Sequence, residues 1–223
     1  MDQLQSSMAT NDAPLQQMLD AIAPQGILLG HRMIASGDEL ALLPEEFAAF
    51  ATSVDKVRRA SGAARIVARD LLNRFGHHNR AIVKSGSGAP IWPNGIVGSL
   101  AHDAEIAMAA IAERRNYASL GVDVEPADPL DPDLLDLIAS RTEMQQIHLD
   151  PCRGRLLFAV KEAVYKAVYP LDGIFLDHHD VEVNFNRGTA QVLNGRVVHF
   201  RYGVGRHIVV LAFISSVPPA TPT

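Results

Sequence analysis

The change from helical to strand periodicity along the chain most constrains its fold. From Arg155 to Tyr169 apolar residues recur every three or four positions, which predicts an amphipathic helix that Pro170 and Gly173 are expected to end. β-branched and aromatic residues then dominate three segments: 175–185, 197–202 and 207–214. This order predicts a mixed α+β fold in which the last third of the chain pairs mainly antiparallel.

Other segments add expected elements. An arginine-rich helix is predicted from Asp55 to Phe75, with Gly76 following it. Residues 119–125 alternate in polarity as a strand does, and Asn194-Gly195 is the signal of a type I′ hairpin turn. Residues 106–112 are expected to form a buried strand or helix. Residues 130–139 and 141–149 are each expected to form a short helix.

Composition and charge narrow the classes of function. The chain has 223 residues, of which 48% are hydrophobic, and 20 Lys and Arg against 25 Asp and Glu give a net charge of −5. This balance predicts a folded protein and disfavours a general nucleic-acid coat or a polybasic membrane binder. The single Cys152 excludes an internal disulfide, and no apolar run is long enough to cross a bilayer. We expect a cytoplasmic protein of about one and a half domains.

Basic residues concentrate on one predicted helix and its sequel. Eight of the 20 lysines and arginines lie within residues 56–84, where Asp70 is the only acid. On the helix, Arg58, Arg65 and Arg69 fall within about 40° of one another, so three guanidiniums would converge on one phosphate-bearing ligand. A solvated helix face explains the same run equally well.

Acidic residues form a second cluster. Asp123 and Glu125 are two apart on the predicted strand and point to the same face, and like charges so close need a cation between them or a shifted pKa. Glu162 and Lys166 share a face of the later helix, where such a pair is ordinarily surface decoration. If this helix packs beside the strand, Glu162 completes a three-carboxylate site that suits Mg²⁺ with substrate phosphates.

Two motifs carry a family resemblance. Residues 121–125 read GVDVE, which matches G-[IV]-D-x-E, and residues 158–167 read FAVKEAVYKA, which matches [FW]-x-x-K-E-[AS]-x-x-K-[AL]. In this order and about 40 residues apart, they resemble the motifs of the 4′-phosphopantetheinyl transferases. Softer matches at residues 65–69, 90–93 and 98–102 resemble the Sfp type, in its siderophore-synthetase-activating (enterobactin) branch.

The resemblance implies an enzyme that moves the 4′-phosphopantetheine arm of coenzyme A onto a serine of an acyl, aryl or peptidyl carrier protein and releases adenosine 3′,5′-bisphosphate. It implies that Asp123, Glu125 and Glu162 hold Mg²⁺ against the CoA pyrophosphate. Glu162 would also accept the serine proton, and Lys166 would stabilise or protonate the departing bisphosphate. The residues expected to contact CoA phosphates are Arg58, Arg65, Arg69, His102 and Lys161.

The resemblance also implies an architecture and partners. Two similar pseudo-symmetric halves, each a small antiparallel sheet with helices, are expected over residues 1–117 and 118–223, with CoA in the cleft between them. The expected partners are CoA and an apo carrier protein of siderophore, polyketide or nonribosomal peptide biosynthesis, with no nucleic acid. The enzyme is expected to act as a monomer.

Three positions depart from the family pattern, and two other classes of protein stay open. Ala101 stands where Ser or Thr precedes His102, Ala89 replaces a lysine, and Ser61-Gly62 replaces an acidic-aromatic pair. The first alternative is a Mg²⁺-dependent phosphohydrolase or nuclease, which also uses acids with a lysine but is disfavoured by the net charge of −5. The second is a non-catalytic module that binds CoA or carrier proteins, which the complete set of acids and lysine disfavours.

Overall fold

Two antiparallel sheets lie side by side in this protein. The computed structural model describes residues 12–147 and 151–216, and its sheets have the strand orders β1-β3-β2 and β4-β8-β7-β6-β5. The strands are β1 (Ile27–Met33), β2 (Ile96–His102), β3 (Ile106–Glu113), β4 (Tyr117–Pro126), β5 (Val181–Asn184), β6 (Thr189–Val192), β7 (Val197–Val204) and β8 (His207–Ser215). The predicted α+β class with antiparallel sheets is therefore confirmed.

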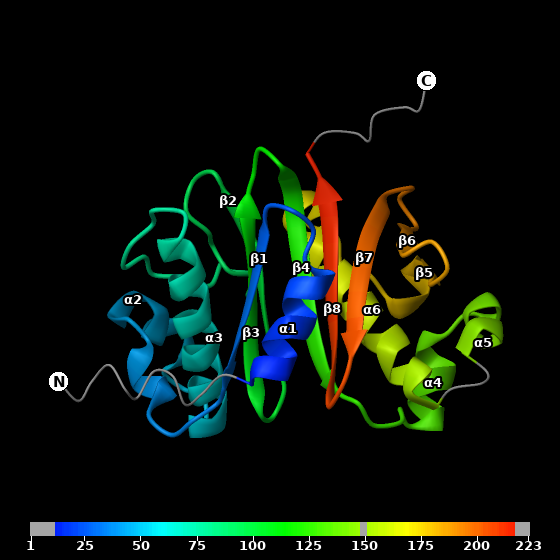
Figure 1. The fold of residues 1–223 in the computed structure, drawn as a ribbon, viewed down its shortest axis with the longest axis horizontal. Coiled ribbons are helices and arrows are strands. Elements are labelled where there is room, and N and C mark those ends of the chain that lie inside the picture. The colour runs from blue at the N-terminus through cyan, green and yellow to red at the C-terminus, as the bar shows by residue number, and fades with distance from the viewer. Residues whose placement is uncertain (1–11, 148–150, 217–223) are drawn as a thin grey trace.

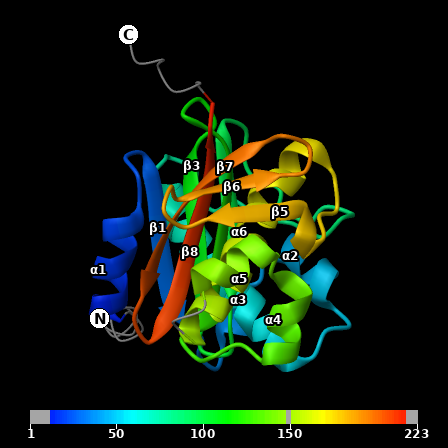
Figure 2. The same ribbon diagram turned by 90° about the vertical axis from the view of Figure 1, so that its right-hand side faces the viewer.

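Helices cover both faces of the strands. They are α1 (Ala13–Ile22), α2 (Pro44–Phe47), α3 (Asp55–Asn73), α4 (Pro132–Ile138), α5 (Arg141–Ile147) and α6 (Pro151–Asp172), with the short 3-10 helices η2 (Asp38–Ala41), η3 (Ala48–Phe50) and η4 (His178–Asp180). In Figure 1 α1 lies in front of the strands and α6 behind them, and the turned view in Figure 2 places α3 on the same side as α6. Within the described ranges, no helix is both long and apolar enough to cross a membrane.

One apolar core runs across both sheets. It contains Leu19 of α1 and Ile106 of β3 from the first half, together with Val122 of β4 and Leu211 of β8 from the second, and all four are fully buried. At the junction the backbone N–H of Val122 donates to Ser99 Oγ of β2 at 3.0 Å. Because this core is shared, separating the two sheets would expose apolar surface on each of them.

Several expected elements occur with corrected ends. Residues 106–112 are in strand β3, the buried central strand of its sheet. Helix α5 ends at Ile147, and the last two residues of the predicted 141–149 helix lie outside the described residues. Helix α6 continues through Pro170 to Asp172, which corrects the expected end at Pro170. A proline in the last turn removes one helical hydrogen bond, and Gly173, at φ 65°, then caps Tyr169 O.

The turn at Asn194-Gly195 also differs from the prediction. Gly195 has φ 85° and its N–H donates to Val192 O at 2.8 Å, but among the described non-glycine residues only Asn79 has a positive φ. A type I′ turn needs positive φ at both central positions. The hairpin instead has a three-residue loop, in which Leu193 and Asn194 form an ordinary turn and Gly195 takes the left-handed position.

A close approach of α6 to β4 explains the glycine of the first motif. A Cβ atom on Gly121 would lie 1.8 Å from Ala163 O, so only glycine lets the helix cross the strand at this depth. The crossing places the next turn of α6, with Lys166, over Asp123. Both motifs therefore meet in space, as the magnesium-site hypothesis required.

Candidate active site

A cleft of about 390 Å³ lies between α3 and α6, on the face of the strands opposite α1. Its walls come from both halves of the chain and carry several cationic and aromatic groups. Those side chains are Arg65, Lys84, Trp92, His102, Arg114, Tyr165, Lys166 and Tyr169. A cavity lined by cations and aromatic rings suits an anionic ligand with an extended organic part.

Asp123 forms a tight pair with Lys166, which lines this cleft, whereas Asp123 itself is not one of the lining residues. Lys166 Nζ donates to Asp123 Oδ1 at 2.7 Å and to Val122 O at 3.1 Å. Asp123 is 6% exposed, and its second oxygen, Oδ2, is buried without a hydrogen-bond partner. Burial raises the pKa of Asp123, although Lys166 acts in the opposite direction. A buried carboxylate oxygen without a partner is costly unless a cation binds it.

Glu125 and Glu162 are near neighbours of Asp123. Burial, followed by the negative charge of Asp123, raises the pKa of each of these glutamates above its usual range. Glu125 is partly compensated by Arg155 Nη1 at 3.2 Å. Mutual repulsion between carboxylates and their hard oxygen donors fit a divalent cation. In residues 12–147 and 151–216, however, no three His, Cys, Asp or Glu side chains lie close enough together to form a metal site.

Of the three predicted arginines, the structure brings only Arg65 to the cleft. Arg69 donates from Nη1 to both oxygens of Glu46, at 2.9 and 3.0 Å, and from Nη2 to Ala41 O. Arg58 pairs with Asp55 in its own helix. The expected convergence of three guanidiniums is wrong, because α2 and the start of α3 supply carboxylates that lie outside the basic stretch and neutralise two of them.

Arg65 itself is held rigidly. Its Nε donates to Ile82 O at 2.9 Å and its Nη1 to Ser61 O at 3.1 Å, and the guanidinium stacks 4.8 Å from the centre of the Phe50 ring. Burial lowers the pKa of Arg65, and the nearby carboxylate of Glu46 opposes this shift. A buried guanidinium with a fixed orientation is prepared to bind an anion at little further entropic cost.

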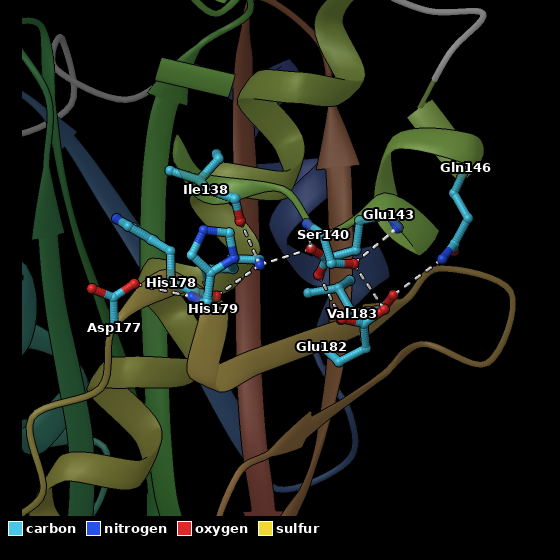
Figure 3. A network of polar contacts seen from close by, with 10 residues as sticks. Ile138, Ser140, Glu143, Gln146, Asp177, His178, His179, Glu182 and Val183 are labelled. Carbon is cyan, nitrogen blue, oxygen red and sulfur yellow. Dashed lines mark hydrogen bonds and ion pairs between the residues drawn. The ribbon is translucent and has the colours of Figure 1, made fainter. Parts of the chain in front are cut away.

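Lys161 does not line the cleft, and its side chain stabilises the contact of α6 with neighbouring elements. Its ammonium donates to Ile138 O at 2.7 Å, to Glu143 Oε2 at 2.8 Å and to His178 O at 2.8 Å, and the side chain is 1% exposed. Figure 3 shows this network between α5, η4 and the start of β5. All three ammonium protons are used, so the predicted contact of Lys161 with a CoA phosphate is corrected: the residue fastens α6 to α5 and η4.

His102 ends strand β2 at the cleft, where sequence reasoning placed it. Shielding by the surrounding walls lowers the pKa of its ring, and the positive charges of Lys166 and Lys84 act in the same direction, whereas Asp103 opposes them. The ring is therefore held mainly neutral, and a phosphate that neutralised Lys166 and Lys84 would favour its charged form.

Several cleft residues were missed by sequence reasoning. Lys84 lies in the basic stretch but was not singled out, and its Nζ sits 4.3 Å from the centre of the Phe50 ring. Phe50 and Glu46 come from short helices that wrap onto α3, and no local pattern reveals that contact. Tyr165 shares the helix face of Glu162 and Lys166, so the motif offered a signal for it.

The departures from the family pattern have local explanations. Ala101 is 4% exposed and belongs to the shared core, so a hydroxyl there would not reach the cleft. A Cβ on Gly62 would lie 1.9 Å from Asp38 O, so the glycine allows η2 to touch α3. Lys84 is paired by a β-bridge with Pro90, the residue after Ala89, and both Lys84 and Ala89 line the cleft, so a lysine is present near the position where Ala89 replaces one.

Buried acids, a lysine on the same site and a cationic cleft define an enzyme that acts on an anionic substrate. Residues 45–112 match the 4′-phosphopantetheinyl transferase N-terminal domain family, and residues 119–212 match the 4′-phosphopantetheinyl transferase superfamily. The chain is 33% identical to 4′-phosphopantetheinyl transferase Svp of Streptomyces mobaraensis over 92% of each chain. It is 36% identical to 4′-phosphopantetheinyl transferase Npt of Nocardia iowensis, over 80% of this chain and 82% of that one.

The chain belongs to the 4′-phosphopantetheinyl transferase family, and it is a transferase. This sets aside the phosphohydrolase and the non-catalytic module. Enterobactin synthase component D of Salmonella typhimurium is 33% identical, but only over 35% of this chain and 34% of that one. The family is thus shown, whereas the enterobactin branch is not.

Proposed function

We propose that this enzyme transfers the 4′-phosphopantetheine group from CoA to a serine of an apo carrier protein in a Mg²⁺-dependent reaction that releases adenosine 3′,5′-bisphosphate. The observation that carries the proposal is the buried Asp123, whose Oδ1 binds Lys166 of the cationic cleft while its Oδ2 has no partner. Residues 1–117 would supply the CoA contacts, and residues 118–223 the metal ligands and the proton-transfer groups.

The metal would be held by Asp123, Glu125 and Glu162. When bound, Mg²⁺ would neutralise charge on the pyrophosphate from which the phosphoryl group is transferred. The protein's part is to present three carboxylates of which Asp123 is fixed by its backbone strand and Glu125 is oriented by Arg155.

Proton transfer would fall to two charged residues of α6, Glu162 and Lys166. Burial and Asp123 raise the pKa of Glu162, which moves this carboxylate toward the range useful for a general base. Glu162 would accept the proton of the carrier serine. Lys166 would donate toward the departing bisphosphate, and its contacts with Asp123 Oδ1 and Val122 O fix the position of the ammonium.

The anionic adenosine end of CoA would lie toward Arg65 and His102. Arg65 contributes a fixed guanidinium, and His102 contributes a ring whose protonation rises when a phosphate approaches. The pantetheine arm would pass the aromatic side chains of the cleft toward α6. We expect the enzyme to work as a monomer, because both walls of the cleft come from one chain. We also expect it to be cytoplasmic.

A mass measurement tests the function. The protein is incubated with CoA, Mg²⁺ and an apo carrier protein, and intact-mass spectrometry records the added arm. Transfer is expected with Mg²⁺ and none with a chelator. No mass increase with any of several carriers, for a protein shown to be folded, would refute the proposal.

A panel of carriers addresses the pathway. We propose a role in siderophore, polyketide or nonribosomal peptide biosynthesis, with siderophore synthetases as the first candidates because of the partial match to enterobactin synthase component D. Ranking kcat/KM over acyl, aryl and peptidyl carrier proteins would identify the physiological class. A preference for the acyl carrier of fatty-acid synthesis would contradict the assignment to secondary metabolism.

A further inference from the structure

Ion pairs join the two halves of the described chain at one place. The turn between β2 and β3 carries Asp103 and Glu105, the turn between β7 and β8 carries Arg206, and His207 is the first residue of β8. His207 Nδ1 lies 2.9 Å from Asp103 Oδ2, and Arg206 Nη2 lies 2.6 Å from Glu105 Oε2. We call these four residues the inter-half clasp.

Within the clasp the histidine and the aspartate carry most of the interaction. Their side chains are 7% and 10% exposed, whereas Arg206 is 72% exposed and its pair with Glu105 is worth little in water. Asp103 Oδ1 also accepts from the N–H groups of Glu105 and Ile106, both at 2.7 Å. Both carboxylate oxygens of Asp103 are therefore bound, one to His207 and one to its own turn. A displacement of His207 would thus displace the β2–β3 turn.

Each end of the clasp is attached to a different part of the active site. Asp103 directly follows His102, which lines the cleft from the first half. His207 stands opposite Pro126 in the β4–β8 ladder, directly beside the Glu125–Ile208 pair, and Arg206 O accepts from Ala127 N at 3.2 Å. The clasp thus connects the cleft histidine to the strand that carries Asp123 and Glu125.

We propose that His207 and Asp103 are positioning residues, which fix His102 relative to the carboxylate strand and so set the affinity of the cleft for CoA. This inference rests on the proposed function, in which His102 contacts CoA. Without the clasp, the β2–β3 turn is held only by its own sheet, and His102 samples positions away from a phosphate bound near Lys166.

A double-mutant cycle on CoA binding tests this proposal. The dissociation constant for CoA is measured by calorimetry in the presence of Mg²⁺ for wild type, His207→Leu, His102→Ala and the double variant. We expect His207→Leu to weaken binding roughly three- to ten-fold, as coupled contacting residues do, and to have no further effect once His102 is absent. The variant His207→Asn keeps a donor at the position of Nδ1 and should restore most of the affinity.

A matched control separates positioning from loss of stability. His31 is also buried, and its ring nitrogens bind Gln16 Oε1 and Asp12 N within the first half. His31→Leu should lower the melting temperature as His207→Leu does but leave the CoA affinity unchanged. Additive effects of the His207 and His102 substitutions, or equal effects of both leucine variants on affinity, would overturn the proposal.

The same binding measurements distinguish failure of the proposed function from failure of the clasp proposal. Absence of CoA binding by the folded wild type would refute the proposed function and the clasp together. Intact binding with an unchanged constant in His102→Ala would remove His102 from the CoA site and overturn the clasp proposal. Intact binding that depends on His102 but not on His207 would overturn the clasp alone.

Discussion

Replacing Lys161 with methionine separates its two conceivable roles. The structure gives Lys161 three hydrogen bonds inside the protein, one of them to the fully buried Glu143, and none toward the cleft. Lys161→Met keeps the aliphatic length but removes the ammonium. It leaves the carboxylate of Glu143 without its ammonium partner, and the carbonyls of Ile138 and His178 without this donor.

The expected loss of stability is large. Removing one partner of a buried ion pair costs about 3–5 kcal/mol, and Glu143 is partly protected because its oxygens also accept from Ser140 N and Val183 N at 2.8 Å each. The loss should therefore lie toward the lower end. For a chain of this length it lowers the melting temperature by roughly 6–20 °C. A second change, Glu143→Gln, removes the unpaired charge and should recover part of that loss.

The KM for CoA distinguishes the two roles of Lys161. If Lys161 only fastens α6 to α5 and η4, the KM for CoA of Lys161→Met stays within about two-fold of wild type at temperatures well below unfolding. A lost phosphate contact would instead cost about 1.5–3 kcal/mol, or more than ten-fold in KM. Thermal unfolding and steady-state kinetics on the same sample check both. A raised KM with an unchanged melting temperature would refute the structural role.

Three further perturbations test the site. Asp123→Asn should abolish transfer. It should also remove the stabilisation that Mg²⁺ with CoA gives the wild-type enzyme, which is roughly 5–10 °C in melting temperature at a hundred-fold excess over the dissociation constant. Substitution of the exposed Asp136 by Asn is the control, and a preserved Mg²⁺-dependent shift in Asp123→Asn would exclude Asp123 as a metal ligand. Glu162 has a raised pKa in the folded protein, so the folded state holds its proton more tightly than the unfolded chain, and the contribution of Glu162 to the unfolding free energy of the metal-free enzyme should fall as pH rises above about 4.3. Glu162→Gln should therefore make the pH slope of denaturant-measured stability more positive across that window, and an unchanged pH slope would contradict this cause. Gly121→Ala should lower the unfolding free energy by about 3 kcal/mol or more and reduce transfer, because the new Cβ would lie 1.8 Å from Ala163 O. The control Gly86→Ala, where nothing lies within 4 Å of the new Cβ, should do neither. A wild-type melting temperature for Gly121→Ala would mean that α6 does not cross β4 so closely.

Patterns with short range in the sequence determined much of this protein. The strand alternation around Asp123 and Glu125 fixed that both carboxylates share a face, because side chains of a strand repeat every two residues. The helical spacing of Glu162 and Lys166 fixed that they project together. The two motifs also indicated the family, and with it the meeting of strand and helix that the structure contains.

Only the tertiary structure decided which charges are available to a ligand. Arg58, Arg65 and Arg69 are nearly equivalent on a helical projection, but Arg65 alone of the three lines the cleft. Glu46, from a distant segment, pairs with Arg69 and also lies 3.8 Å from Arg65 Nε. Lys161 stands next to Glu162 in the motif, yet the helix turns it about 100° away, toward Glu143. Partners that neutralise a charge come from distant segments, and their positions depend on packing that local periodicity does not encode.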